Sequence, residues 1–258
     1  METTTSKDGT TLAFDRRGEG PPVVVVGGAS VDRAAGAGLS SELAPDFTVL
    51  NHDRRGRGDS GDTPPYAVDR EIEDVMAMLD AADDSAVLFG SSSGAALALK
   101  AVVAGAPATK LVLWEPPFIP EGEPRPPADT ASIIRAFVDE GRRSDAVEFF
   151  MSKVVGLPLE VVEQAKTSPA WAQQEAIAHT LAYDAEIMGD YELPAEDAAT
   201  VTVPTLVMAG DASFPWMAVT ASALADAMPN GEFRLLEGQS HGASPEALGA
   251  AVRAFVRA

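Results

Sequence analysis

Short apolar runs recur along the first half of the chain and return near its end. They occupy 23–26, 47–50, 87–89, 110–114, 205–209 and 233–236. Uninterrupted apolar runs such as Val23–Val26 are typical of strands that are buried on both faces, as in the interior of a parallel sheet. Between the runs lie stretches with helical spacing, for example 66–83, in which Val68, Ile72, Val75 and Leu79 recur. This alternation predicts an α/β fold with a mostly parallel central sheet and helices on both faces.

The pattern differs at the start of the chain and again in its middle. Asp8-Gly9 separates two polar-apolar stretches and predicts a hairpin at the start of the chain. The proline-rich segment 116–127 is unsuited to helix or inner strand and precedes three helical stretches, 130–140, 145–155 and 158–188. We therefore predict a core formed by residues 1–116 and 201–258, interrupted by a helical lid insertion over 117–200.

The composition of the chain indicates which partners it can bind and whether it can span a membrane. The chain has 258 residues, no cysteine and a formal net charge of −20, so nucleic acids and anionic membranes would repel it. No apolar run is long enough to span a membrane, and the first residues form no signal-peptide core. We expect a cytoplasmic protein with a small-molecule substrate. A homodimer remains open. No metal-ligand cluster or dinucleotide fingerprint stands out, so we expect no metal and no cofactor.

The segment Gly90-Ser91-Ser92-Ser93-Gly94 joins an apolar strand to an apolar helix. Strand, sharp turn and helix around Gly-x-Ser-x-Gly is the arrangement of a nucleophile elbow. Glycines on both sides let the strand and helix approach closely, so that the serine hydroxyl projects from the end of the sheet. Ser92 is therefore the candidate nucleophile, although a Gly/Ser-rich loop without catalytic function would also fit the pattern.

Four segments in this order resemble the α/β-hydrolase superfamily over nearly the whole chain. They are the elbow, the loop 53–60 (similar to D-x-R-G-x-G-x-S), the strand region 203–210 and the histidine loop 238–242. The resemblance implies that His241 is the base for Ser92, and that the backbone N–H groups of Ala29 and Ser93 form the oxyanion hole. Many relatives have His-Gly where this chain has Gly27-Gly28.

The acid of a catalytic triad is the point at which the chain departs from the resemblance. Ser213 stands where relatives usually have aspartate, and Asp211 lies two positions earlier. A minority of the superfamily places the acid after the sixth strand, where this chain has Glu115. An acid there can still accept the imidazole N–H and fix its tautomer. We favour Glu115 over Asp211, and a site without any acid remains an alternative.

Other residues are assigned to substrate binding or to structure. Gly28, Trp114, Phe118 and Trp216 are candidates for the substrate pocket, although core packing would equally explain the aromatic ones. We expect Asp53, Arg55 and Asp59 to brace the elbow without a catalytic role. His52 is expected to be structural, and His179 to lie at the surface or along the pocket.

These observations favour a serine hydrolase that cleaves an ester, lactone or similar acyl bond through an acyl-enzyme. A serine at the elbow disfavours epoxide hydrolases and haloalkane dehalogenases, whose nucleophile is a carboxylate. Ser213 at the usual acid position motivates a second hypothesis, C–C cleavage, cyclisation or elimination with His241 as general base. A catalytically silent ligand-binding protein is the third.

Overall fold

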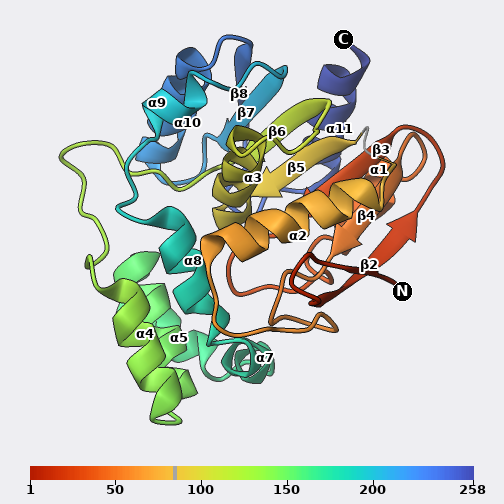
Figure 1. Ribbon diagram of the computed structural model, residues 1–258. Coiled ribbons are helices and arrows are strands. Elements are labelled where there is room, and N and C mark those ends of the chain that lie inside the picture. The colour runs from red at the N-terminus through yellow and green to blue at the C-terminus, as the bar shows by residue number, and fades with distance from the viewer. Residues whose placement is uncertain (84–85) are drawn as a thin grey trace.

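The computed structural model describes residues 1–83 and 86–258 and confirms the predicted alternation of strands and helices (Figure 1). Within these residues, eight strands form one sheet in the order β1-β2-β4-β3-β5-β6-β7-β8. Their bounds are β1 (Glu2–Thr5), β2 (Thr11–Arg17), β3 (Pro22–Val26), β4 (Thr48–His52), β5 (Val87–Ser91), β6 (Lys110–Trp114), β7 (Thr205–Gly210) and β8 (Gly231–Leu236). The predicted hairpin β1–β2 and the pair β2–β4 are antiparallel, and the other pairs are parallel.

Helices cover both faces of the sheet. The core helices are α1 (Ala37–Leu43), α2 (Val68–Asp80), α3 (Ser93–Val103), α10 (Pro215–Ala227) and α11 (Pro245–Arg257). Residues of α2, α3 and α10 share one hydrophobic cluster with the sheet, whereas residues of α1 and α11 share another. The four valines of β3 divide between these clusters, with Val24 and Val26 in the first and Val23 and Val25 in the second. This division explains why the strand is apolar without alternation.

The segment between β6 and β7 is helical and has a hydrophobic cluster of its own. Its elements are α4 (Thr130–Asp139), α5 (Arg143–Phe149), a π-helical segment (Phe150–Val154), α6 (Leu159–Ala165), α7 (Ala170–Ala176), α8 (Thr180–Met188) and α9 (Ala195–Ala198). The single helical stretch predicted over 158–188 is wrong, because α6, α7 and α8 are separate. Pro169 precedes α7, and a proline there cannot continue a preceding helix. Figure 1 shows α4, α5, α7 and α8 together at one end of the molecule, with α8 nearest the sheet.

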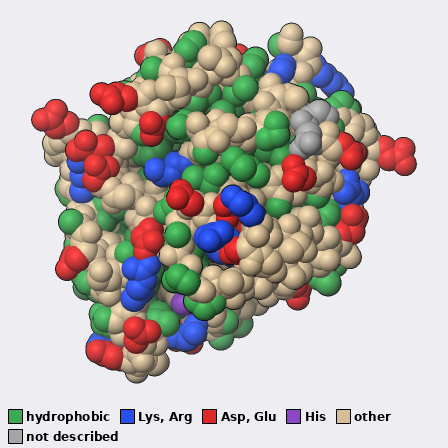
Figure 2. Space-filling view, viewed as in Figure 1, with side chains coloured by type: hydrophobic (Ala, Val, Ile, Leu, Met, Phe, Trp, Pro, Cys, Tyr) green, Lys and Arg blue, Asp and Glu red, His purple; other side chains and the backbone are tan. Residues whose placement is uncertain are grey.

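The surface has the character that the acidic composition predicts. Figure 2 shows acidic side chains spread over the visible face, with lysine and arginine side chains between them. None of the helices in residues 1–83 and 86–258 combines the length and the apolar character needed to cross a bilayer.

Candidate active site

Ser92 lies at the turn between β5 and α3, in a backbone conformation that side chains rarely adopt. Its φ is 55° and its ψ is −127°, and its N–H donates to the carbonyl of Trp114 at 2.9 Å. A Cβ on Gly90 would lie 2.5 Å from the carbonyl oxygen of Gly94, and a Cβ on Gly94 would lie 2.4 Å from that of Gly27. Only glycine fits at either position, so the two glycines permit the strained turn that exposes the Ser92 hydroxyl.

Glu115 and His241 lie together at the ends of β6 and β8, although 126 positions separate them in sequence. Nδ1 of His241 is 2.5 Å from Oε2 of Glu115, a short contact between a ring nitrogen and a carboxylate oxygen. The Glu115 side chain is fully buried, whereas that of His241 is 41% exposed. With Nδ1 engaged by the carboxylate, Nε2 is the ring nitrogen that remains for a proton from another group.

Two further donors hold the Glu115 carboxylate in place. The backbone N–H of Gly210 donates to Oε1 at 2.9 Å, and the Ser213 hydroxyl donates to Oε2 at 2.9 Å. Ser213, at the usual position of the acid, therefore binds the acid on the neighbouring strand. Asp211 is directed elsewhere and accepts the N–H of Gly238 at 2.6 Å. Of the acids considered from sequence, Glu115 is the one bonded to His241.

The two expected oxyanion donors border the space in front of Ser92. Ser93 is the first residue of α3, so its N–H is among those without an acceptor inside the helix. Within residues 1–83 and 86–258, no backbone carbonyl accepts a hydrogen bond from the N–H of Ala29. Gly28 packs on the nucleophile, since a Cβ there would lie 2.9 Å from Cβ of Ser92. Glycine at position 28 thus lets the loop lie against the elbow, whereas a Cβ on Gly27 would only touch Val31 at 3.6 Å.

Two cavities meet at Ser92 and His241, which line both of them. One, of about 270 Å³, extends under the helical segment 117–200 and is lined by Phe150, Val154, Trp216 and Met217, among others. The other, of about 300 Å³, extends toward α1 and α11 and includes Gly28 and Trp114.

The predicted substrate-binding residues divide between these cavities and the core. Gly28, Trp114 and Trp216 line a cavity, and Trp114 also donates from Nε1 to the His241 carbonyl at 2.9 Å. Phe118 instead belongs to the hydrophobic core and lines neither cavity, because its neighbours Pro117 and Ile119 occupy the wall.

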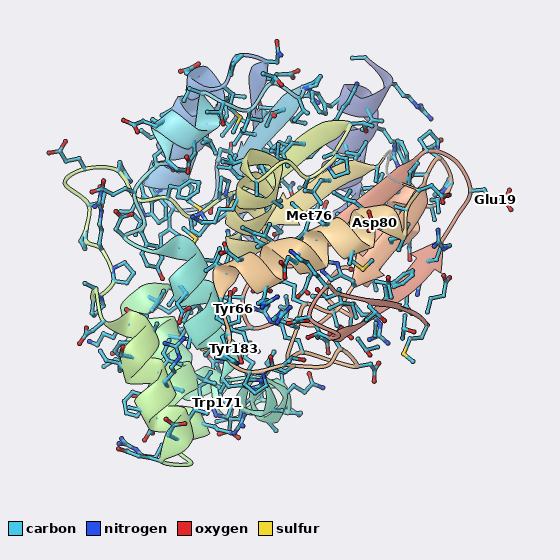
Figure 3. All side chains as sticks on the ribbon, in the orientation of Figure 1. Glu19, Tyr66, Met76, Asp80, Trp171 and Tyr183 are labelled. Carbon is cyan, nitrogen blue, oxygen red and sulfur yellow. The ribbon has the colours of Figure 1, made fainter. Side chains whose placement is uncertain are left out.

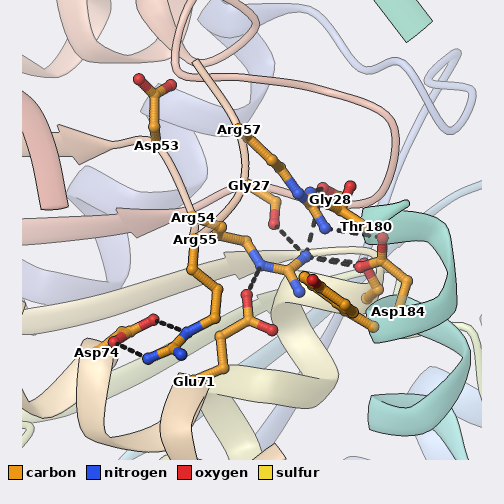
Figure 4. A network of polar contacts seen from close by, with 12 residues as sticks. Gly27, Gly28, Asp53, Arg54, Arg55, Arg57, Glu71, Asp74, Thr180 and Asp184 are labelled. Atoms are coloured by element: carbon orange, nitrogen blue, oxygen red, sulfur yellow. Dashed lines mark hydrogen bonds and ion pairs between the residues drawn. The ribbon is translucent and has the colours of Figure 1, made fainter. Parts of the chain in front are cut away.

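The loop 53–60 is held to α2 and to Arg33 by ion pairs, the first of which Figure 4 shows. Arg55 forms two hydrogen bonds of 2.7 Å with Asp74 on α2. Arg33 pairs with Asp53 and, at 2.7 Å, with Asp59. None of Asp53, Arg55 and Asp59 lines a cavity at Ser92, and their ion pairs do not include a residue of the elbow, so bracing of the elbow stays a prediction.

The sequence analysis did not single out three charged residues near the elbow, which are Arg54, Arg57 and Asp184. Arg54 and Arg57 project from the loop 53–60 toward Asp184 of α8, and each donates to its carboxylate at 2.8 Å (Figure 4). The Ser93 hydroxyl donates to the same carboxylate at 2.7 Å. Burial raises the pKa of Asp184, but the charges of Arg57 and Arg54 outweigh it and hold this pKa below its usual value.

A stacked tyrosine pair fixes α8 to the core beside these charges. The rings of Tyr66 and Tyr183 lie 3.8 Å apart and nearly parallel (Figure 3). The Tyr66 hydroxyl donates at 2.8 Å to Glu71, which also accepts from Arg54 at 2.6 Å.

The remaining histidines lie outside the Ser92 site. His52 is buried, with Nδ1 3.0 Å from the carbonyl oxygen of Val25. Burial, together with the charge of Arg54, lowers its pKa from 6.5 to about 4. His179 lies 3.5 Å from Asp62 and lines a separate surface hollow. Among the described residues, no three histidine or acidic side chains are grouped as a metal site would require.

Comparison with known proteins agrees with this fold. The model of the alpha/beta hydrolase family matches residues 23–255. The crystal structure of an alpha/beta hydrolase from Sphaerobacter thermophilus is 50% identical, with a TM-score of 0.94, over 99% of this chain and 100% of that one. A thermophilic esterase from Thermogutta terrifontis (23% identity, TM-score 0.75, 99% and 97% covered) and an esterase from a Rhodococcus species (20%, 0.74, 100% and 98%) share the fold. No curated protein matches the chain.

Proposed function

The chain belongs to the alpha/beta hydrolase family, and we propose that it is a serine hydrolase that cleaves small apolar esters through an acyl-enzyme. The observation that supports this most strongly is the juxtaposition at the elbow. Ser92 and His241 line the same cavities, and Glu115 holds His241 by Nδ1. Nucleophile, base and orienting acid are the three parts that a serine needs to become reactive at neutral pH.

The proposed reaction has two halves. Nε2 of His241 takes the hydroxyl proton as Oγ of Ser92 attacks the substrate carbonyl, and Glu115 stabilises the imidazolium. The N–H groups of Ala29 and Ser93 stabilise the oxyanion of the tetrahedral intermediate. As the C–O bond breaks, His241 gives its proton to the leaving alkoxide. Water, deprotonated by His241, then attacks the acyl-enzyme. As the bond to Oγ breaks, His241 returns this proton to Ser92, and the acid is released.

The walls of the two cavities favour an apolar substrate. Toward the helical segment the wall consists mainly of side chains such as Phe150, Val154, Trp216 and Met217. On the other side Val25, Leu39 and Leu248 are likewise apolar. We assign one cavity to the acyl group and one to the alcohol, and we propose that the segment 117–200 acts as a lid over the first.

The experiment that tests this function combines an ester series with mass spectrometry. We expect p-nitrophenyl esters from acetate to decanoate to be hydrolysed, with kcat/KM highest at an intermediate chain length that fills one cavity. Rapid acid quenching is expected to trap an acyl adduct on Ser92. Ser92→Ala is expected to lose both adduct and turnover. Full activity in that variant would refute the proposal.

The alternative of non-hydrolytic chemistry has less support than it had from sequence. That hypothesis depended on the serine at the usual acid position. Glu115 on the neighbouring strand instead lies beside His241, and Ser213 donates to its carboxylate. A catalytically silent binding protein would have no need of this arrangement. Turnover that His241→Ala abolishes without loss of folding would exclude it.

A further inference from the structure

A buried charge cluster contacts the residues that provide the two oxyanion donors, and one of its members, Asp184, also borders the cavity under the helical segment. It consists of Arg54 and Arg57 from the loop 53–60, Glu71 from α2 and Asp184 from α8 (Figure 4). All four side chains are at most 2% exposed. Two positive and two negative charges make the cluster formally neutral, so burial does not leave a net charge without compensation.

Arg57 is bonded to the peptide that provides one oxyanion donor. Its Nη1 donates to the carbonyl oxygen of Gly28, and Nη1 of Arg54 lies 3.4 Å from the same oxygen. That carbonyl belongs to the peptide unit whose N–H is that of Ala29. In a trans peptide the C=O and N–H point in opposite directions. A guanidinium on the buried side therefore turns the Ala29 N–H toward the cavity that Ala29 lines.

Asp184 is bonded to the residue that provides the other donor. The Ser93 hydroxyl donates to Oδ1 at 2.7 Å, while Arg57 donates to Oδ2 at 2.8 Å. One carboxylate from α8 thus connects the first residue of α3 with the arginine on the Gly28 carbonyl. A single carboxylate of the helical segment is thus bonded directly to Ser93 and, through Arg57, to the peptide of Ala29.

A solely structural ion cluster would be expected to satisfy its own donors. In the described part of the chain, Nη2 of Arg54 and Nε of Arg57 are buried without a hydrogen-bond partner. Buried unpaired N–H groups are unfavourable for stability. The cluster thus makes its contacts with Gly28 and Ser93 while two of its own N–H groups stay unsatisfied.

We propose that Arg57 and Asp184 are positioning residues that fix the oxyanion hole, and that α8 is thereby part of the catalytic apparatus. This inference rests on the proposed hydrolase function. A hydrogen bond at the carbonyl end of a peptide polarises its N–H, and preorganised donors stabilise the transition state more than the bound substrate. Loss of the cluster is therefore expected to lower kcat and to leave KM nearly unchanged.

The test compares two isosteric variants of buried, arginine-bound aspartates. Asp184→Asn removes the charge behind the oxyanion hole, whereas Asp74→Asn removes the charge that Arg55 binds on α2, away from it. With p-nitrophenyl butyrate we expect Asp184→Asn to lose about 10- to 100-fold in kcat with KM within about threefold. The rate of Ser92 labelling by a fluorophosphonate is expected to fall in parallel. Asp74→Asn is expected to lower the thermal unfolding midpoint while keeping kcat within about threefold.

Two more variants keep the test decisive if Asp184→Asn does not fold. Ser93→Ala removes the hydroxyl that donates to Asp184 and accepts from Arg54 at 3.3 Å, while both charged partners stay in place. We expect a loss of about tenfold in kcat. Arg57→Lys keeps a donor for the Gly28 carbonyl and is expected to retain more kcat than Arg57→Met.

The outcomes separate this inference from the function on which it rests. Folded Asp184→Asn and Ser93→Ala variants with wild-type kcat, or a loss in Asp74→Asn equal to that in Asp184→Asn, would overturn the positioning role alone. Absence of turnover and of labelling in the wild-type protein would overturn the proposed function and the positioning role together.

Discussion

The substitution Glu115→Gln tests the triad with almost no change in shape. Gly210 donates its N–H to Oε1, and this buried donor requires an acceptor. The glutamine oxygen is therefore expected to stay on Gly210, which places the amide NH₂ at the position of Oε2, beside Nδ1 of His241. An NH₂ group donates to Nδ1, so the imidazole proton moves to Nε2. The histidine is then in the tautomer that cannot accept the Ser92 proton.

The expected loss follows from this exchange of tautomers. An amide in place of the triad carboxylate lowers kcat by about 10⁴-fold in a serine protease with intact geometry. We expect about 10³- to 10⁴-fold here, which corresponds to about 4 to 5.5 kcal/mol of transition-state stabilisation. KM is expected to change little, because Glu115 is buried and lines neither cavity. Stability is expected to fall by about 1.5 to 3 kcal/mol through the lost charge-assisted hydrogen bonds.

The assay is hydrolysis of p-nitrophenyl butyrate, with thermal unfolding measured on the same samples. Asp211→Asn is the matched control, because Asp211 is the other acid considered for the triad and its carboxylate binds Gly238 of the histidine loop. We expect that control to retain kcat within about threefold. A folded Glu115→Gln protein within tenfold of wild-type kcat, or a larger loss in Asp211→Asn, would refute the assignment of Glu115.

Three further predictions follow from the same structure. The pair Glu115→Ala/Ser213→Asp is expected to recover at least tenfold of the kcat lost in Glu115→Ala, because the Ser213 hydroxyl lies 2.9 Å from the carboxylate oxygen that binds His241; absence of recovery in steady-state assays would contradict this geometry. Gly94→Ala is expected to lower the free energy of unfolding, measured in urea, by about 1 to 3 kcal/mol, because its Cβ would lie 2.4 Å from the Gly27 carbonyl oxygen. An unchanged free energy of unfolding would show that the elbow can relax. Folded His52 has a pKa of about 4, against 6.5 when unfolded, so unfolding takes up a proton between these values and stability falls as pH drops from 6.5 to 4. That shift corresponds to about 3 kcal/mol, and His52→Asn is expected to flatten urea-unfolding stability over this range; an unchanged pH dependence would assign the loss to other groups.

The sequence predicted the fold and the position of the elbow because both depend on local patterns. Apolar runs buried on two faces, and glycines on either side of Ser92, have the same meaning in any chain of this architecture. The pairing of Glu115 with His241 was one of three alternatives, the others being Asp211 and a site without an acid, because Glu115 and Asp211 both lie just after neighbouring strands. Which of them faces the histidine depends on side-chain direction, and spacing alone does not determine it.

The charge cluster behind the oxyanion hole was missed for a different reason. Asp184 lies 127 positions from Arg57, within a segment that the sequence analysis predicts only as helical. Arg54 and Arg57 stand beside Arg55 in one charged loop, and the sequence does not distinguish the arginine that binds α2 from those that reach α8. The available signal was Asp184 itself, an acid among the apolar residues that α8 buries.

The central claim is that Glu115 and His241 make Ser92 reactive beside a working oxyanion hole. Labelling with a fluorophosphonate, followed by peptide mapping, tests it most directly, because the reagent requires an activated serine and yields a tetrahedral adduct. We predict one label, on Ser92, that is absent in Ser92→Ala and at least tenfold slower in Glu115→Gln. A folded protein that remains unlabelled, or a label on another serine, would contradict the account.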